Sequence, residues 1–108
     1  MEIGEVIKMF IKKRKLSQGQ VAKDIGKSRT ALSQIINGAY KPLPETLESL
    51  SKVLNVPVPV FHFLCIDEES VPPENRALFR ALAPSMERYL LDVFNTSPED
   101  LEIEKKAL

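Results

Sequence analysis

The sequence contains little cysteine, no tryptophan and no long apolar run. With one cysteine among 108 residues, no disulfide can form within the chain, and we expect a protein of the reducing cytoplasm. The longest apolar run, 56–66, is interrupted by Pro57, Pro59 and His62 and is too short to span a bilayer. The acidic N-terminus lacks the apolar segment of a signal peptide. These absences argue against secretion and against a membrane-spanning chain.

Catalytic and metal-binding groups are also scarce. His62 and Cys65 have a spacing that could begin a metal site, but structural zinc needs four ligands and the chain has no other His or Cys. A partly buried histidine and a core cysteine are the expected alternative. The cysteine has no histidine and acid constellation around it, the acids at 67–69 fall in a connector, and no Gly-rich phosphate loop occurs. We therefore expect neither an enzyme nor a metal or other cofactor.

Charge is balanced in total and uneven along the chain. Residues 1–65 contain ten Lys and Arg and five acids, for a net charge of +5, whereas residues 66–108 contain five and ten, for −5. One interpretation of such an imbalance is simply a solvated surface without a binding role. It also favours a basic half that meets a polyanion and an acidic half that does not.

Apolar residues at helical spacing predict an all-α chain, and strand-like alternation is absent. The first helix has its apolar stripe over residues 3–11. A second helix is expected over 18–25, because Ser17 stands where a capping box begins and Gly26 suits a left-handed helix end. Ser28 then caps a third helix, which ends at an Asn-Gly pair.

Two further helices complete the expected N-terminal domain, residues 1–65. Pro44 suits the first turn of a fourth helix, Asn55 can close that helix, and a short fifth is expected over 57–64.

The chain changes character in residues 66–108, a helical extension. Residues 67–73 indicate a linker or a tight connection. The apolar stripe that follows continues across Pro84, which predicts either one bent helix or two consecutive helices. A polar last helix is expected over 97–107. The stripe consists of Leu78, Leu82, Met86, Tyr89, Leu90, Val93 and Phe94.

The helices at 18–25 and 28–37, joined by a turn that contains glycine, have the spacing of a helix-turn-helix unit. Val21, Ile25, Leu32 and Ile35 are expected to face the core, with the small Ala22 where the helices cross. From residue 3 to about 64 the chain resembles the phage-repressor and Cro type of helix-turn-helix family, also called XRE-type. The matching residues are Leu16-Ser17-Gln18, Val21-Ala22, Ile25-Gly26, Ser28-Arg29, Asn37-Gly38, Lys41-Pro42 and Leu54-Asn55-Val56.

This resemblance implies a sequence-specific double-stranded DNA-binding transcription regulator whose third helix enters the major groove. Arg29, Thr30 and Gln34 match the family's base-reading positions. Ser33 lies on the same face of the helix, but the favoured interpretation is that it is a polar surface residue and does not read bases. The residues that match phosphate-contacting positions are Gln18, Ser28, Asn37, Tyr40 and Lys41, and the Lys27 ammonium can reach a phosphate or solvent.

Four positions depart from the family pattern, and one of them is Lys27, at a turn position that relatives usually fill with an apolar residue. Many relatives pair an arginine of the first helix with a glutamate of the third, and Ile11 and Ile36 stand at those positions. Two packed hydrophobic residues can replace a buried ion pair with little loss, so the same fold is expected. Lys15 replaces a common helix-ending glycine.

Proteins of this type usually bind pseudo-palindromic sites as dimers. We expect the extension to supply the dimer interface, because its stripe is too apolar to remain in water. It could instead cover the N-terminal domain or bind another protein. The rival function is therefore an antitoxin-like protein whose acidic C-terminal helices bind a partner protein.

Overall fold

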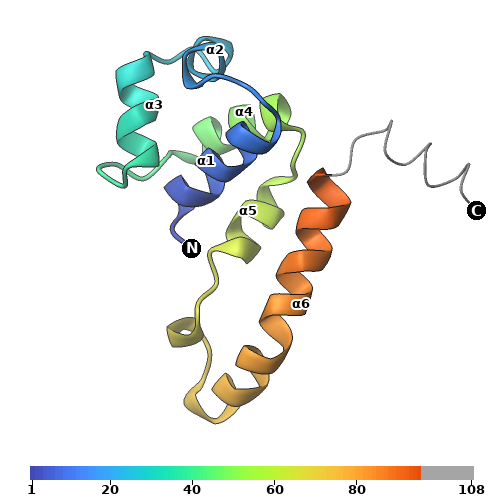
Figure 1. The fold of residues 1–108 in the computed structure, drawn as a ribbon. Helices are drawn as coiled ribbons and strands as arrows, with labels where there is room; N and C mark the ends of the chain where they lie inside the picture. The colour runs from blue at the N-terminus through green and yellow to red at the C-terminus, as the bar shows by residue number, and fades with distance from the viewer. Residues whose placement is uncertain (96–108) are drawn as a thin grey trace, which may run out of the picture.

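A computed structural model of the chain describes residues 1–95, and in this range it contains six α-helices, two short 3-10 helices and no strand (Figure 1). The predicted all-α fold is confirmed. The last predicted helix, 97–107, lies outside the described residues. The helices are α1 (Ile3–Lys13), α2 (Gln18–Asp24), α3 (Arg29–Ile36), α4 (Pro44–Leu54), α5 (Val58–Leu64) and α6 (Arg76–Asn95), with 3-10 helices at Glu68–Ser70 and Pro73–Asn75.

Serine caps begin the two central helices as predicted. The Oγ of Ser17 accepts a hydrogen bond from the backbone N–H of Gln20 at 3.1 Å, and the Oγ of Ser28 accepts one from Ala31 at 3.0 Å. Each bond satisfies a first-turn donor that has no partner within the helix. The Gln20 side chain does not complete a capping box, because its Nε2 donates to Asp24 Oδ1 at 2.8 Å.

Left-handed residues end the helices at the expected places. Gly26 has a φ of +71°, and Asn55, which follows α4, has a φ of +55°. Lys15 also lies in this region, with a φ of +57°, at a position where the family commonly has glycine. A side chain with a Cβ is strained there, so Lys15 carries a backbone penalty that a glycine would avoid.

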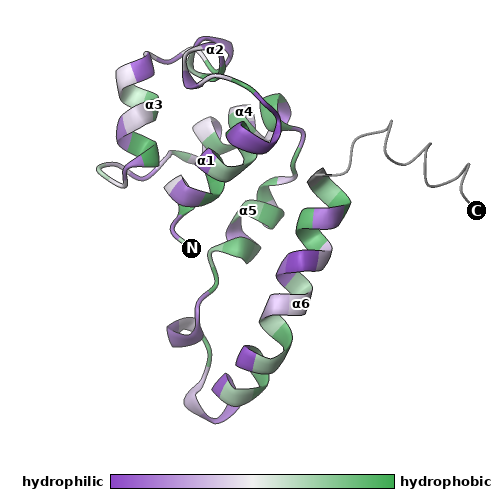
Figure 2. Ribbon diagram, in the orientation of Figure 1, coloured by the Kyte–Doolittle hydropathy of each residue, from purple (hydrophilic) through white to green (hydrophobic). Residues whose placement is uncertain are grey.

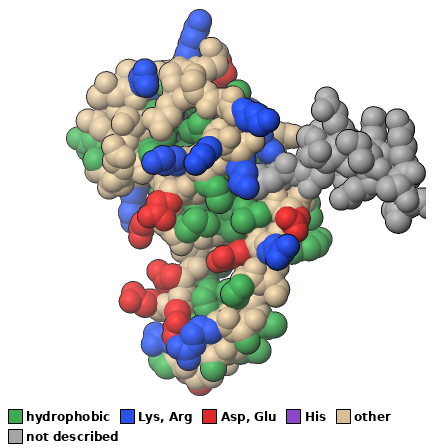
Figure 3. Space-filling model, in the orientation of Figure 1, with side chains coloured by type: hydrophobic (Ala, Val, Ile, Leu, Met, Phe, Trp, Pro, Cys, Tyr) green, Lys and Arg blue, Asp and Glu red, His purple; other side chains and the backbone are tan. Residues whose placement is uncertain are grey.

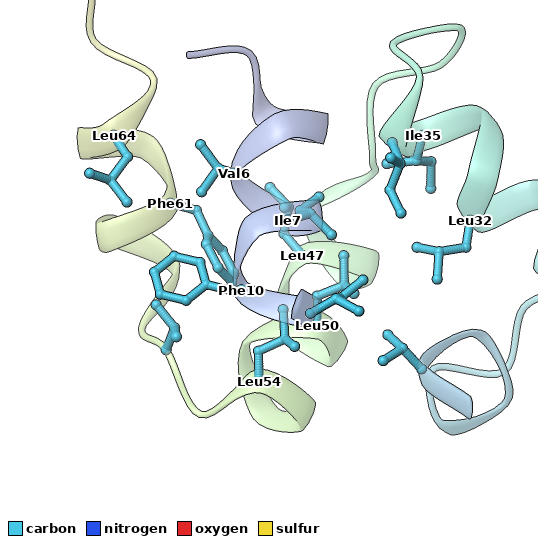
Figure 4. Packing of buried hydrophobic residues seen from close by; sticks show 14 of the residues in the cluster. Val6, Ile7, Phe10, Leu32, Ile35, Leu47, Leu50, Leu54, Phe61 and Leu64 are labelled. Carbon is cyan, nitrogen blue, oxygen red and sulfur yellow. The ribbon is translucent and has the colours of Figure 1, made fainter. Parts of the chain in front are cut away.

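The buried core lies entirely between residues 6 and 64 (Figure 4). The rings of Phe10 and Phe61 meet edge to face at 5.8 Å near its centre. Ile11 and Ile36 are both buried, as expected for an apolar replacement of an ion pair, while Ile25 packs against the core half-buried. The core residues are Val6, Ile7, Phe10, Ile11, Val21, Ala22, Leu32, Ile35, Ile36, Leu47, Leu50, Leu54, Val56, Val60, Phe61 and Leu64.

The residues around Pro84 form one continuous helix rather than two, which decides between the two alternatives. Pro84 is exposed, so the carbonyl that its missing N–H leaves unpaired can bond to water. The segment before α6 is a tight connection. Asp67 Oδ1 accepts hydrogen bonds from the N–H and the hydroxyl of Ser70, which hold the pKa of Asp67 below its usual range.

Two arginines form hydrogen bonds at the two ends of α6. Near its start, Arg76 Nε donates to the carbonyls of Glu68 and Val71, both at 3.1 Å. At its end, Arg14 from the C-terminus of α1 donates through Nε to Leu54 O at 2.8 Å and through Nη2 to Phe94 O. Guanidinium bonds to the carbonyls at two helix C-termini also favour the helix dipoles.

This arrangement leaves only part of the predicted interface stripe on α6 exposed. Leu90 and Phe94 are half-buried and pack against the core of the same chain, so they are only partly available to a second molecule. The other five stripe residues are exposed. Within residues 1–95, no helix combines the length and the apolar character that crossing a membrane requires.

Candidate nucleic-acid interface

Helix α3 has one buried side and one exposed polar side. Leu32, Ile35 and Ile36 point into the core, and Ala22 is buried where α2 meets α3. Thr30 and Gln34 lie on the opposite side and Arg29 lies in the first turn, and all three are exposed. Among the residues the structure describes, these three side chains have no hydrogen bond or ion pair. They are held on a rigid helix and are free to meet a ligand.

Ser33 and Asn37 occupy the edge of this surface. Ser33 is half-buried, and Asn37 Nδ2 lies 3.5 Å from its Oγ, at the outer limit of a hydrogen bond. Asn37 is exposed and its backbone N–H closes the helix by donating to Ser33 O at 2.9 Å. Ser33 is therefore less accessible than Arg29 or Gln34.

A small hollow beside α3 is lined by several residues that the sequence predicts to contact DNA. It has a volume of about 180 Å³ and lies between α3 and the start of α4. Lys27, Gln34, Tyr40 and Lys41 line it, and all four are exposed. Two ammonium groups, a phenol and an amide around one hollow can donate hydrogen bonds to phosphate oxygens.

The beginnings of α2 and α3 also lie together. Gln18 is half-buried at the start of α2, next to Gly19. A Cβ built on Gly19 would lie 4.0 Å from Cδ of Arg29, so the arginine stem passes close to the start of α2. The Ser28 hydroxyl oxygen accepts its capping bond, and its proton remains able to bond a phosphate.

Sequence reasoning missed one contact that positions α3. Gly4 packs against the last turn of that helix so closely that a Cβ would lie 2.3 Å from Ile36 O. No local pattern distinguishes this glycine, because the contact joins α1 to a distant helix. The roles predicted for Arg29, Thr30, Gln34 and their neighbours stay predictions, while Lys27, Gln34, Tyr40 and Lys41 line one hollow.

The burial predicted from the sequence for His62 and Cys65 was wrong. His62 is exposed rather than partly buried, and Cys65 is half-buried rather than part of the core. Partial burial raises the pKa of the Cys65 thiol, with the N-terminal amine opposing and Glu2 adding to the shift. Within residues 1–95, no three His, Cys, Asp or Glu side chains lie close enough to hold a metal ion.

Comparison with known proteins identifies the same region. Residues 7–61 match the family model described as helix-turn-helix. The chain is 40% identical over 55 residues to the ImmF control region 10 kDa protein of Bacillus phage phi105, covering 51% of this chain and 61% of that protein. It is 32% identical over 81 residues to the immunity repressor protein of the same phage, covering 75% of this chain and 54% of the repressor.

A bacterial relative matches over a longer stretch. The chain is 34% identical over 99 residues to the HTH-type transcriptional regulator DicA of Escherichia coli (strain K12), covering 92% of this chain and 71% of DicA. The chain spans less than two thirds of the length of the two phage relatives. No solved structure matches this chain significantly.

Proposed function

Since the chain belongs to the phage-repressor-like (XRE-type) helix-turn-helix family, we propose that it is a sequence-specific double-stranded DNA-binding transcription regulator. It acts as a dimeric repressor that reads the major groove through α3. The observation that carries the proposal is the exposed polar side of α3, with Arg29, Thr30 and Gln34 held on a helix that is buried on its other side.

The chemistry of these three side chains suits base edges. An arginine can hold guanine O6 and N7 with two bonds, and a glutamine can do the same for adenine N6 and N7. The methyl group of Thr30 can contact the methyl group of thymine. Ser33 contributes less, because it is half-buried beside Asn37.

Phosphate contacts flank the base-reading residues on both sides. Lys27, Tyr40 and Lys41 surround the hollow beside α3, and Gln18 and Ser28 lie at the starts of α2 and α3. Asn37 completes this set at the end of α3. Contacts of this kind fix the register of a protein on the duplex and do not themselves distinguish sequences.

A dimer supports specificity in a domain of this size. One helix-turn-helix covers only a short stretch of DNA, and two copies on adjacent half-sites double the contacts. One relative is named an immunity repressor protein, which supports a repressor in particular, and another is named an HTH-type transcriptional regulator, which supports a regulator of transcription.

Selection of bound sites from a pool of random duplexes tests the proposal. The full chain, at a stated salt concentration, should enrich a motif with two related half-sites about one turn of DNA apart. A control chain carrying Arg29→Ala and Gln34→Ala should enrich no motif while retaining weak general binding. Enrichment of no motif by the unaltered chain would contradict the proposal.

A further inference from the structure

An apolar groove runs between α5 and α6. Two adjoining hollows, of about 460 and about 440 Å³, share Phe63 and Met86 in their walls and so form one continuous depression. We refer to it as the α5–α6 groove. Pro59 borders it from α5, and Leu82 and Tyr89 border it from α6. Figure 2 shows apolar residues on both helices, and none of the residues that line the groove is charged.

Helix α6 also carries an exposed apolar ridge, and four of its five side chains form the wall of the groove on the α6 side. Its side chains are 60% exposed at Leu78, 50% at Leu82, 47% at Met86, 68% at Tyr89 and 49% at Val93. Hydrophobic side chains are correspondingly prominent on the surface around α6 in Figure 3. The residues are separated by four, four, three and four positions, the alternation that a helix shows when it packs along another helix.

Resting on the dimer of the proposed function, we propose that the α5–α6 groove and the ridge together form the surface that binds a second copy of this chain. A ridge that forms one wall of a groove can enter the groove of a second copy when a two-fold axis relates the two copies. The α6 ridge of one copy fills the groove of the other, and the reverse contact forms at the same time. This surface adds α5, through Pro59 and Phe63, to an interface that the sequence assigned to α6 alone.

The area is sufficient for a dimer. Five large side chains that are each about half exposed, together with the α5 wall of the groove, remove on the order of 1,000 Å² from water when both copies are counted. An area of about 1,000 Å² is the minimum expected of a biological interface. Exposed contiguous apolar patches of several hundred Å² are unusual in monomers, which is a further reason to expect a covered surface.

Charge favours self-pairing over binding to a charged partner. The groove and the ridge contain no charged side chain, so two copies bring no like charges into direct contact there. The cations of α6 are paired within the chain: Arg80 Nη1 lies 2.6 Å from Glu68 Oε1, and Arg88 Nε lies 4.0 Å from Asp92 Oδ2. A highly basic or acidic partner would find no complementary charge in the contact area.

Sedimentation of the full chain without DNA tests the surface directly. Leu82→Glu places a charge on the exposed ridge and should raise the dimer dissociation constant about a hundredfold or more, because a carboxylate would be buried unpaired. Ala81→Glu is the matched control. Ala81 is exposed one residue earlier and lines neither hollow, so this variant should remain dimeric. Both variants should keep the helical content of the unaltered chain, and only Leu82→Glu, as a monomer, should unfold at a lower temperature.

Cross-linking gives a second readout that does not depend on stability. With Cys65→Ser in place, Met86→Cys lies at the middle of the ridge and should form a disulfide-linked dimer on mild oxidation. Ala81→Cys, in the same background, should not. A two-fold axis passing near the centre of the ridge brings the two copies of residue 86 together.

Other outcomes would overturn the proposal in different ways. A monomer at all concentrations, or equal dimerisation by both glutamate variants, would show that copies do not pair here. A monomer that carries another protein in fixed ratio, lost only in Leu82→Glu, would assign the surface to a partner protein. Because none of these measurements includes DNA, they are independent of whether the chain reads a sequence.

Discussion

Gly4 allows α1 to pack closely against α3, and Lys15, after the end of α1, has a left-handed backbone conformation. Gly4 leaves the start of α1 in direct contact with the end of α3, where a Cβ would lie 2.3 Å from Ile36 O and 2.6 Å from Ile35 O. These are backbone atoms of α3 and cannot turn aside as a flexible side chain would. The absence of a side chain at Gly4 therefore helps to set the position of α3.

Gly4→Ala should destabilise the protein by about 1–3 kcal/mol, because α1 must move away from α3 to admit the methyl group. Gly19→Ala is the matched control. Its nearest neighbour would be Arg29 Cδ at 4.0 Å, and it should be neutral or stabilising by up to about 1 kcal/mol through helix propensity. Urea unfolding of the two variants measures the difference, and equal stability would contradict the close contact.

Lys15→Gly should stabilise the protein by about 0.5–1 kcal/mol, since residue 15 has a φ of +57° that glycine adopts without strain. Lys13→Gly, inside α1, should instead destabilise it by about 1 kcal/mol. Thermal unfolding compares the two. A loss of stability in Lys15→Gly would mean that the lysine side chain contributes more than the strain removes.

Helix ends and helix placement were predictable to different degrees. The ends at Ser17, Ser28, Gly26 and Asn55 follow from local chemistry, because a cap or a left-handed residue acts within a few positions. The face of α3 was predictable for the same reason. Helix periodicity fixes which residues share a side once the buried ones are known.

The placement of α6 was not predictable, because it depends on contacts between distant parts of the chain. Arg14 reaches carbonyls that lie 40 and 80 positions away in sequence, and nothing local distinguishes it from the lysines beside it. The groove needs α5 as well as α6, so an apolar stripe on one helix could not reveal it. The burial of His62 and Cys65 was predicted wrongly for the same reason, because burial depends on which distant helices pack nearby.

Arg14→Met should loosen the end of α6, because the last turns lose the guanidinium bond at Phe94 O while α1 keeps its apolar packing. Amide hydrogen exchange in the last two turns of α6 should accelerate about tenfold or more, with the core of α1 to α5 unchanged. Lys13→Met, an exposed neighbour, controls for the lost charge. Unchanged exchange in Arg14→Met would mean that Leu90, Leu91 and Phe94 hold the helix without it.

At the scale of the described molecule, basic side chains are most numerous over the N-terminal helices, whereas the surface around α6 combines apolar side chains with charges of both signs. Lys and Arg gather over the N-terminal helices on the face shown in Figure 3, and hydrophobic side chains are exposed around α6. This division suits a molecule that meets a polyanion with one part and a copy of itself with the other.

Lys41→Ala should weaken binding to every duplex and reduce the slope of log affinity against log salt concentration by about one, as expected for one lost phosphate contact. Lys27→Ala should act in the same direction, because both residues line the hollow beside α3. Arg88→Ala, on the exposed surface of α6, should leave the slope unchanged. An unchanged slope in both lysine variants would place this hollow away from DNA.

The central claim is that α3 reads bases, and a comparison of affinities on two duplexes tests it most directly. Arg29→Ala and Gln34→Ala should each weaken binding to the selected duplex by about 1–3 kcal/mol and leave binding to a scrambled duplex nearly unchanged. Ser33→Ala should have little effect on either duplex. Equal losses on both duplexes would contradict the account, because Arg29 and Gln34 would then contact only phosphates.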